Sequence, residues 1–374
     1  MADPIFSPDG KWMWTGSEWI PAPPSSASGA DSTINLQDSM MSGDVNVEQN
    51  SNDASSAINL KDSAMSGDIN ITQNNAEDIA TAMVQALERM GFSGQSSPAE
   101  LTPSQEAEVE QVLEMSEQLA GHGIEIDPYT EIKLGNAAEL AGRMSSAQNH
   151  YFRALETFIR NHNRLWEAIS RQNLGNIAKT RGDLAEAERL QRESLAIMRE
   201  IGDRQGEAAS LNNLGNIAET RDDLAEAERL HRESLTIRRE LKDRRGEADS
   251  LGNLGNIAAQ RGNLHDAERL IQDNLTIRRE IGDRSGEANA LNSLGIIAKN
   301  KKDYTRGKGL QQQSLVLYRE INDRAGEAIA LINLGNIAAD LGNAYERNRL
   351  YTQAVRLQRE IGIPIQQWFI DNGY

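Results

Sequence analysis

The chain has 374 residues, of which 38% are hydrophobic and none is cysteine, and its formal net charge is -17. The missing cysteines exclude disulfides and thiolate metal sites. Residues 1–127 hold three basic and twenty-one acidic side chains, whereas the rest of the chain holds thirty-six and thirty-five, so no basic stripe is present to bind the phosphates of nucleic acid or of an anionic membrane.

The first residues, Met-Ala-Asp-Pro-Ile-Phe, lack the basic end and the apolar stretch of a signal peptide, and no run of the sequence approaches eighteen apolar residues. We therefore expect a soluble, cytoplasmic protein. Residues 6–24 hold three of the five tryptophans. Because Asp9-Gly10 and Thr15-Gly16 are turn signals on either side of a Trp-Met-Trp segment, we predict a short β-hairpin module at residues 1–24.

Residues 25–75 contain a short repeat. Ile34-Asn35-Leu36 returns twenty-four residues later as Ile58-Asn59-Leu60, and apolar and polar residues alternate on both sides of a Ser-Gly-Asp turn in each copy. Two interpretations are open. The segment forms two strand-turn-strand units, whose edges would favour self-association, or it is disordered because it is rich in Ser, Asn and Asp.

Two helices are predicted next. Residues 76–101 hold a linker and an amphipathic helix with Ile79, Met83, Leu87 and Met90 on one face, and this helix is a candidate oligomerisation contact. Residues 102–126 begin with Thr-Pro-Ser-Gln, a capping-box pattern with proline in the first turn. We predict that this second helix caps the array that follows.

The triplet Leu-Gly-Asn returns every forty residues through the rest of the chain. A fixed period of this length is typical of a quasi-one-dimensional stack, in which each unit buries its apolar face against its neighbours. We assign six repeats to residues 127–362 and a C-terminal cap or tail to residues 363–374. The glycines of the triplet, including an altered fifth copy, are Gly135, Gly175, Gly215, Gly255, Gly295 and Gly335.

The segment from Asp203 to Lys242 shows the predicted unit, which is two helices joined by a turn. Asp203 caps a first helix that runs to about Thr220, and Asp223 caps a second helix that ends near Leu241. Apolar residues recur at helical spacing along both helices. The sequence therefore predicts helical hairpins with buried stripes on both helices.

One glycine in each repeat requires a packing explanation. Gly215 lies inside a predicted helix, where glycine costs roughly 1 kcal/mol relative to alanine. Its return in every copy indicates that another helix approaches closely, and we expect the small Ala227 of the second helix to face it.

The linkers between repeats carry charges at fixed positions. An arginine follows each capping aspartate and precedes a glutamate, as in Asp203, Arg204 and Glu207. We expect these opposite charges to pair between successive linkers, as an exposed ladder in which each pair is worth under about 1 kcal/mol.

The spacing within the repeat resembles the tetratricopeptide repeat. After Leu-Gly, an alanine follows twelve residues later (Ala147, Ala187, Ala227, Ala267) and a small or short polar residue seven further on (Ala154, Ser194, Ser234, Asn274, Ser314, Ala354). The forty-residue period and the linker Gly-Asp-Arg-x-Gly-Glu are most similar to the branch called Pins or LGN, and more distantly to kinesin light chains. The resemblance implies an all-α superhelix of about six helix-turn-helix repeats, here with a small β or irregular leader.

In the resembling families the first helices of the repeats line a concave groove, and asparagine dominates their outward positions in this chain. A carboxamide offers two donors and two acceptors, so one asparagine can pair with both groups of a peptide unit. The resemblance assigns peptide binding to Asn173, Asn176, Asn213, Asn216, Asn253, Asn256, Asn333 and Asn336. The alternative is that these amides bond to carbonyls of the adjacent repeat and set the stacking angle.

The repeat that starts near Asp283 interrupts this ladder, because Ile296 takes an asparagine position. A basic cluster surrounds the following turn and consists of Lys299, Lys301, Lys302, Arg306 and Lys308. It is either a contact for an acidic stretch, in a partner or in the chain's own leader, or a solvated surface. In the next repeat, Ile329 and Ile332 are candidates for an apolar end of the groove.

The sequence contains no signature of catalysis. Its five histidines are scattered without ligand spacing, and it has no phosphate-cradling glycine loop, nucleophile elbow or kinase signature. We therefore predict no enzyme activity, no cofactor and no metal. The predicted function is a scaffold or adaptor that binds an extended peptide of a protein partner. The alternative is a self-assembling structural protein, in which the N-terminal strand repeats drive homo-oligomers and the array is a spacer.

Overall fold

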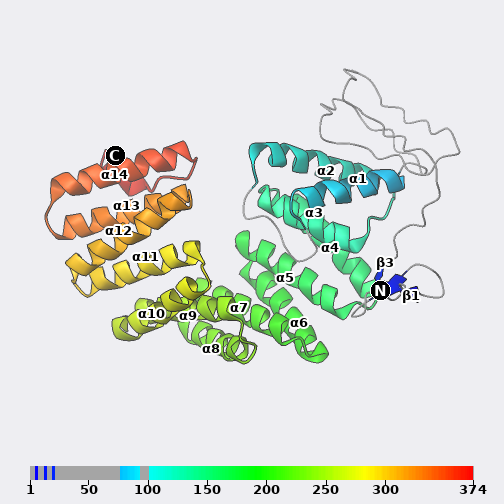
Figure 1. The fold of residues 1–374 in the computed structure, drawn as a ribbon, viewed down its shortest axis with the longest axis horizontal. Helices are drawn as coiled ribbons and strands as arrows, with labels where there is room; N and C mark the ends of the chain where they lie inside the picture. Colours follow the sequence, from blue (N-terminus) through cyan, green and yellow to red (C-terminus); the bar gives the residue numbers. More distant parts are fainter. Residues whose placement is uncertain (1–4, 7–11, 15–18, 22–75, 93–100, 374) are drawn as a thin grey trace, which may run out of the picture. The chain divides into compact units, whose positions relative to one another are not determined.

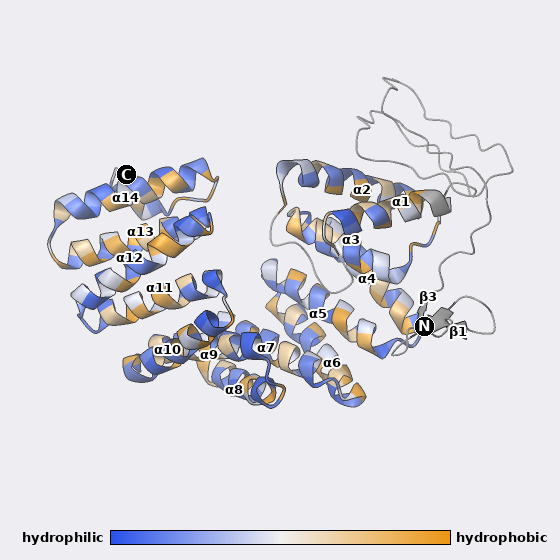
Figure 2. Cartoon of the chain, in the orientation of Figure 1, coloured by the Kyte–Doolittle hydropathy of each residue, from blue (hydrophilic) through white to orange (hydrophobic). Residues whose placement is uncertain are grey.

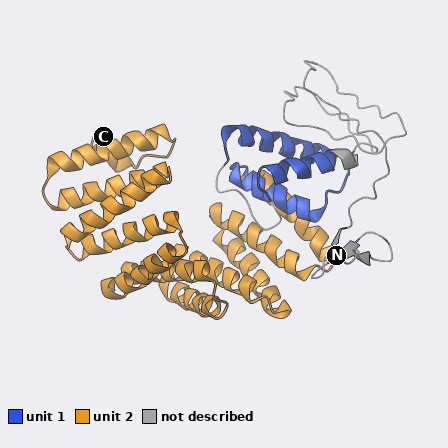
Figure 3. Ribbon diagram, viewed as in Figure 1, with its two compact units in different colours: residues 1–143 blue, residues 144–374 orange. Residues whose placement is uncertain are grey.

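The computed structural model describes residues 5–6, 12–14, 19–21, 76–92 and 101–373 (Figure 1). The short repeats predicted at residues 25–75 lie outside the described residues. The chain divides into two compact units, residues 1–143 and residues 144–374 (Figure 3). The boundary falls between the two helices of the first predicted repeat.

The first unit contains a small antiparallel sheet at its N-terminus. Strand β2 (Trp12–Trp14) pairs with β1 (Ile5–Phe6) on one side and with β3 (Trp19–Pro21) on the other. In the second pairing Trp14 lies opposite Trp19. The sheet therefore has three short strands, with the Trp-Met-Trp segment in the middle.

Three helices of the first unit pack on one another, namely α1 (Ala76–Arg89), α2 (Pro103–Gly121) and α3 (Pro128–Leu140). The capping box of α2 is confirmed, because the Gln105 amide donates to Thr102 Oγ1 at 3.3 Å and the Thr102 amide donates to Gln105 Oε1 at 3.0 Å. Ion pairs tie α1 to both neighbours, Arg89 to Glu108 at 2.7 Å and Glu88 to Lys133 at 2.8 Å.

The apolar face of α1 is buried. Ile79, Met83, Leu87 and Met90 all lie in the interior of the chain, where α2 and α3 pack against α1. This face is therefore covered within the chain itself, and it is not free for the oligomerisation contact that its amphipathic pattern suggests.

The second unit is a stack of helical hairpins. Its helices are α4 (Met144–Arg160), α5 (Arg164–Thr180), α6 (Leu184–Ile201), α7 (Arg204–Thr220), α8 (Leu224–Glu240), α9 (Arg244–Gln260), α10 (Leu264–Glu280), α11 (Arg284–Asn300), α12 (Tyr304–Glu320), α13 (Arg324–Asp340), α14 (Ala344–Glu360) and α15 (Gln367–Asp371). From α5 to α14 each helix packs on the one before it, and α5 also contacts α7, as α9 contacts α11 and α11 contacts α13 (Figure 1). The predicted all-α solenoid is confirmed.

Hydrogen bonds at the helix ends explain why the boundaries follow the sequence pattern. The Gly206 amide donates to Asp203 Oδ1 at 3.0 Å, and the Glu226 amide donates to Asp223 Oδ1 at 3.1 Å. The predicted N-caps therefore hold both helices of the repeat. The Glu226 carboxylate pairs with Arg229 at 2.7 Å instead of returning to the Asp223 amide, so the full capping box is not formed at α8.

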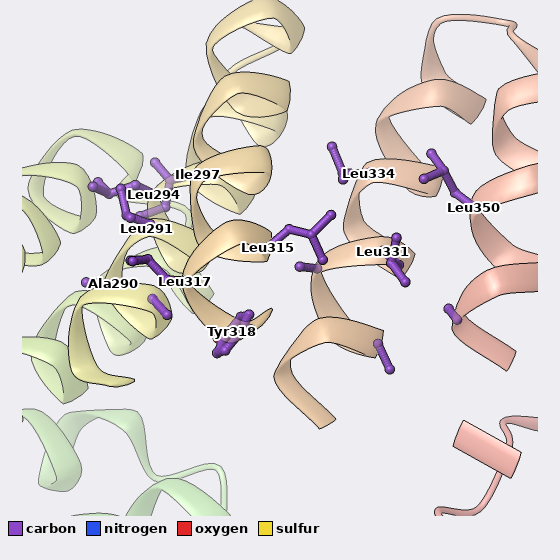
Figure 4. Packing of buried hydrophobic residues seen from close by; sticks show 14 of the residues in the cluster. Ala290, Leu291, Leu294, Ile297, Leu315, Leu317, Tyr318, Leu331, Leu334 and Leu350 are labelled. Atoms are coloured by element: carbon purple, nitrogen blue, oxygen red, sulfur yellow. The ribbon is translucent and has the colours of Figure 1, made fainter. Parts of the chain in front are cut away.

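The core runs between the helices of the stack. Each helix of the array carries both hydrophobic and hydrophilic residues (Figure 2). The predicted stripes are confirmed as buried, among them Leu211 and Leu214 on α7 and Leu230 on α8. In the C-terminal repeats one cluster joins helices α11 to α14, and Figure 4 shows Leu315 of α12 between Leu291 of α11 and Leu331 of α13.

The linker charges pair in a different way from the one predicted. Arg204 Nη2 binds Glu240 Oε2 at 2.8 Å, at the far end of the second helix of its own repeat, and Arg204 Nη1 binds Glu207 at 2.5 Å. The same pattern joins Arg164 to Glu200, Arg244 to Glu280, Arg284 to Glu320 and Arg324 to Glu360. The prediction of arginine pairs between successive linkers is therefore wrong, because each arginine closes its own helical hairpin.

Candidate functional site

We call α5, α7, α9, α11 and α13 the first helices, and α6, α8, α10, α12 and α14 the second helices. The eight predicted asparagines all lie at the surface of first helices. Asn256 is exposed, and the others are partly exposed, namely Asn173, Asn176, Asn213, Asn216, Asn253, Asn333 and Asn336. None of these carboxamides is fully buried between hairpins, so each has some access to solvent.

Part of this surface is hollowed into a cavity of about 320 Å³, which we call the amide groove. Its walls come from α7, α9 and α11, and its floor comes from α10. The lining residues are Asn212, Asn216, Asp249, Gly252, Asn253, Asn256, Ile271, Asn274, Arg278, Gly286, Asn289, Ala290 and Ser293. The structure thus brings three of the predicted asparagines together here, and it places the other five on the first helices outside this cavity.

Carboxamides of neighbouring repeats bond to each other. Asn253 Nδ2 donates to Asn212 Oδ1 at 3.1 Å and to Asn216 Oδ1 at 3.4 Å. Asn333 Nδ2 donates to Asn292 Oδ1 at 2.8 Å in the same way. These bonds link side chains to side chains, whereas the alternative interpretation expected bonds to backbone carbonyls. Because each carboxamide has further donor and acceptor positions, it can join two repeats and still bind another group.

Helical glycines of the first helices make room for side chains of the second helices. A Cβ atom at Gly215 would lie 2.6 Å from the ring carbon Cε1 of His231. The prediction that Ala227 explains this glycine is therefore wrong. The residue that covers each glycine lies sixteen positions after it, and these residues are Gln191, His231, Ile271, Gln311 and Tyr351.

These covering side chains reach the asparagines. Gln191 Nε2 donates to Asn176 Oδ1 at 3.2 Å, and the Tyr351 hydroxyl donates to Asn336 Oδ1 at 2.6 Å. Ile271 lines the amide groove directly. The second helices thus supply a floor that the sequence reasoning missed. The sequence does mark these floor residues. The residue sixteen positions after each glycine varies between repeats, whereas the residue before it is a leucine in each of these five repeats.

A charged cluster borders the amide groove, which Asp249 and Arg278 line. Arg278 pairs with Asp283 at 2.6 Å and also binds Asp249, which lines the groove beside it. Arg238 lies 3.5 Å from Asp243 and 3.7 Å from Asp249. Both arginine side chains are nearly buried, so the carboxylates compensate charges that are largely shielded from water. The sequence reasoning did not identify this cluster.

Two titratable groups near the groove have shifted pKa values. Burial lowers the pKa of His231 to about 4, with a further contribution from the charge of Arg238, so the imidazole is neutral at physiological pH. Burial alone would raise the pKa of Asp283, but the Gly286 amide and the Arg278 guanidinium hold it below its usual value. The carboxylate is therefore charged and supports Arg278.

The basic cluster is largely compensated by neighbouring acids. Lys301 Nζ lies 2.5 Å from Glu268 Oε2, and Arg306 binds the other oxygen of the same carboxylate. Lys299 lies 3.4 Å from Asp340. Lys302 and Lys308 are exposed. Three of the five predicted residues are thus engaged with adjacent helices, and two present their side chains to solvent.

Residues 76–92 and 101–373 contain no group of three or more His, Asp or Glu side chains that could hold a metal ion. None of the helices that the structure describes is long and apolar enough to cross a membrane.

Stacked helical hairpins with a shared polar face define the chain as an α-solenoid. The family model described as tetratricopeptide repeat matches residues 128–200, 174–240 and 206–280. Residues 128–280 thus hold tetratricopeptide repeats, as the sequence predicts. The family model describes tetratricopeptide repeats in general, so this match does not assign the chain to the Pins or LGN branch.

Solved structures share this fold at low sequence identity. The apo form of RapI superposes with a TM-score of 0.59 and 14% identity over 77% of this chain and 99% of that one. A Rap conjugation gene regulator in complex with the Phr* peptide gives 0.55 and 14%, over 80% of each chain. A signal transduction ATPase with a tetratricopeptide repeat sensor, from Pyrococcus horikoshii, gives 0.56 and 14%, over 79% of this chain and 48% of that one. No curated protein matches the sequence.

Proposed function

We propose that this protein is a non-enzymatic, cytoplasmic scaffold or adaptor that binds an extended segment of a protein partner along its first helices. The observation that carries the proposal is the amide groove, where carboxamides from three successive first helices converge on one cavity of about 320 Å³. A cavity of this size, lined by several polar groups, can fix the orientation of a bound chain. The Rap regulator of the same fold, solved with a peptide, supports the proposal.

The asparagines are better suited to bind the backbone of a partner segment than to recognise one particular side chain of it. A carboxamide can donate to a peptide carbonyl and accept from a peptide N–H at the same time, whatever residue that peptide unit belongs to. Asn256 is exposed, and Asn216 and Asn253 lie partly exposed beside it. These three amides line the same cavity, so one extended segment can meet all of them.

Hydrogen bonds alone would give weak binding. A typical net hydrogen bond contributes about 1 kcal/mol, whereas ordering a flexible segment costs several kcal/mol. The varied side chains of the floor, such as Ile271 and Arg278, supply the additional contacts and the selectivity. The exposed Lys302 and Lys308 form a second contact that suits an acidic stretch of the same partner.

The test combines four substitutions in one protein, which we call the fourfold asparagine variant: Asn216→Ala, Asn253→Ala and Asn256→Ala in the amide groove, and Asn213→Ala beside it on α7. We expect affinity for each partner captured from a lysate and identified by mass spectrometry to fall by about tenfold or more, since loss of several hydrogen bonds of about 1 kcal/mol each corresponds to that factor. Binding would be measured by calorimetry on the purified full-length chain.

The matched control removes carboxamides elsewhere. Gln272→Ala and Gln313→Ala delete exposed amides on the second helices α10 and α12, and we expect full affinity in this variant. Circular dichroism must show that the fourfold variant keeps its helix content. If every partner bound that folded variant as tightly as the original chain, the proposed groove mechanism would be wrong.

A further inference from the structure

The polar face of the first helices becomes apolar toward the C-terminal repeats. Ile296 lies forty residues after Asn256, and Ile329 lies forty residues after Asn289, both of which line the amide groove. Ile332 lies eighty residues after Gly252, another lining residue. Isoleucine thus occupies three positions of the binding face on α11 and α13.

These isoleucines are not simply part of the core. The exposed fraction is 36% for Ile296 and 49% for Ile329. Ile332 is partly buried against the cluster of Tyr351, Val355 and Phe369 at the C-terminal end. Exposed aliphatic side chains that gather within a polar surface commonly mark an interaction site.

A bonded pair of carboxamides lies among the isoleucines. Asn333 Nδ2 donates to Asn292 Oδ1 at 2.8 Å and so joins α13 to α11. Ile296 follows Asn292 by one helical turn, and Ile329 precedes Asn333 by one turn, so each isoleucine shares a helix face with one of the two amides. The apolar patch is therefore continuous with the ladder of asparagines and lies on both sides of one of its hydrogen bonds.

The residues of the patch are neutral, and the nearest charges, Lys299 and Asp340, lie one turn beyond it and pair with each other at 3.4 Å. The residues that occupy the binding-face positions on α11 and α13 are Asn289, Asn292, Ser293, Ile296, Ile329, Ile332, Asn333 and Asn336. The central amide groove differs, since it contains Asp249 and Arg278. A charged side chain placed over the isoleucines would lose hydration without an opposite charge, whereas an aliphatic or aromatic side chain would gain from burial.

We propose that the partner segment carries aliphatic or aromatic side chains that pack on Ile296 and Ile329, on either side of the hydrogen bond between Asn292 and Asn333, while its backbone bonds to these two amides. The polar remainder of the segment lies over α7 and α9. This inference rests on the proposed function and adds detail to it, because it states that the C-terminal end of the binding face binds an apolar side chain of the partner. The partner is thus an extended segment of mixed character, with a neutral apolar residue at one end and polar residues in the rest.

The test uses the full-length chain and a phage-displayed library of random linear peptides. We expect peptides that bind the original chain, and that lose affinity with the fourfold asparagine variant, to share an aliphatic or aromatic residue at one position. The variant Ile296→Asn with Ile329→Asn restores residues found at equivalent positions of other repeats, so it should fold normally. Synthetic copies of these peptides should bind it about tenfold or more weakly, as expected for loss of an apolar contact.

A double-mutant cycle shows whether the anchor and the patch meet. Replacing the apolar residue of the peptide by asparagine should weaken binding to the original chain by about tenfold, yet change binding to the isoleucine variant by less than about twofold. The control Val316→Asn changes an apolar side chain of similar exposure, 52%, on the second helix α12, and it should bind every peptide normally.

Three results would overturn the inference. The first is a set of groove-dependent peptides without any shared apolar residue, and the second is equal affinity for the original chain and the isoleucine variant. In both cases binding in the groove itself would stand. The third is an oligomer that dissociates in the isoleucine variant, because the patch would then cover a second copy of the chain. If no peptide responded to the fourfold asparagine variant, the proposed function would fail as well.

Discussion

The imidazole of His231 packs over the backbone of Gly215, so closely that a Cβ atom at position 215 would approach ring carbon Cε1 to 2.6 Å. The two residues lie on the paired helices α7 and α8, and both are buried. A helical glycine that weakens α7 locally therefore makes room for a side chain that extends from α8 toward the binding face.

The substitution Gly215→Ala tests this packing. Helix propensity alone would favour alanine by roughly 1 kcal/mol. We expect the opposite result, a net loss of about 1–3 kcal/mol, because a buried ring must be displaced to accommodate the methyl group. The measurement is the midpoint of urea unfolding, followed by circular dichroism.

The control for this prediction removes the ring. In a chain that already carries His231→Ala, the Cβ atom at position 215 has space, and the second substitution Gly215→Ala should be neutral or stabilising. A similar loss of stability in both backgrounds would contradict the packing explanation.

The same pair shows how far the sequence could predict the structure. The period, the caps at Asp203 and Asp223 and the apolar stripes depend on residues close together in the chain, and all of them are confirmed. The residue opposite Gly215 depends instead on the angle and offset at which two helices cross. A one-turn difference in that offset replaces Ala227 by His231, and no local pattern specifies it.

The partners of long side chains could be predicted from the sequence less well than those of short side chains. Arg204 can reach several carboxylates, and the choice of Glu240 depends on how the ends of α7 and α8 meet. The groove charges Asp249 and Arg278 come from different helices and meet only in the folded stack. The repeat alone places the asparagine columns on one face of the first helices, but whether that face meets solvent or the adjacent repeat depends on how the hairpins stack, so the sequence left both interpretations open.

His231 should make stability depend on pH. Its pKa is lowered to about 4 by burial, and next by the charge of Arg238, whereas in the unfolded chain it is about 6.5. The unfolded state therefore binds the proton more readily, so the contribution of the neutral imidazole is complete above pH 6.5 and is lost as the pH falls toward 4. The expected loss is about 3 kcal/mol, measured by urea unfolding across this range.

The comparison for this pH effect is His231→Gln, because glutamine occupies the equivalent positions 191 and 311. This variant should lose less stability than the original chain between pH 6.5 and 4, since it has no imidazole to protonate. Identical pH profiles for the two proteins would show that His231 does not contribute.

Glu207 should contribute more to the stability of the fold than a more exposed glutamate that also pairs with an arginine. Burial alone would raise its pKa, but hydrogen bonds from Arg199 and Arg204 more than offset this and hold the pKa below its usual value. We expect Glu207→Gln to destabilise the fold by about 1–2 kcal/mol, because a buried acceptor of Arg199 loses its charge. Thermal unfolding at neutral pH would measure the effect.

A more exposed counterpart of this residue is Glu226, whose side chain is 37% exposed and which pairs with Arg229 at 2.7 Å on the surface of α8. Solvent screens this pair, so Glu226→Gln should change stability by less than about 0.5 kcal/mol. Equal effects of the two substitutions would mean that the burial of Glu207 has no energetic consequence.

Asp222 occupies a turn position that favours glycine. Its φ angle is 62°, in the left-handed region, and the equivalent positions of other repeats are Gly182 and Gly262 with φ angles of 81° and 76°. A side chain with a Cβ atom is strained in this conformation by roughly 1 kcal/mol, whereas glycine adopts it freely. We therefore expect Asp222→Gly to stabilise the fold by up to about 0.5 kcal/mol in urea unfolding, after the greater flexibility of glycine in the unfolded chain is included. The substitution Asp222→Ala removes the same charge but keeps the Cβ atom, so it should give no such gain, and a gain of equal size would attribute the effect to charge and not to backbone strain.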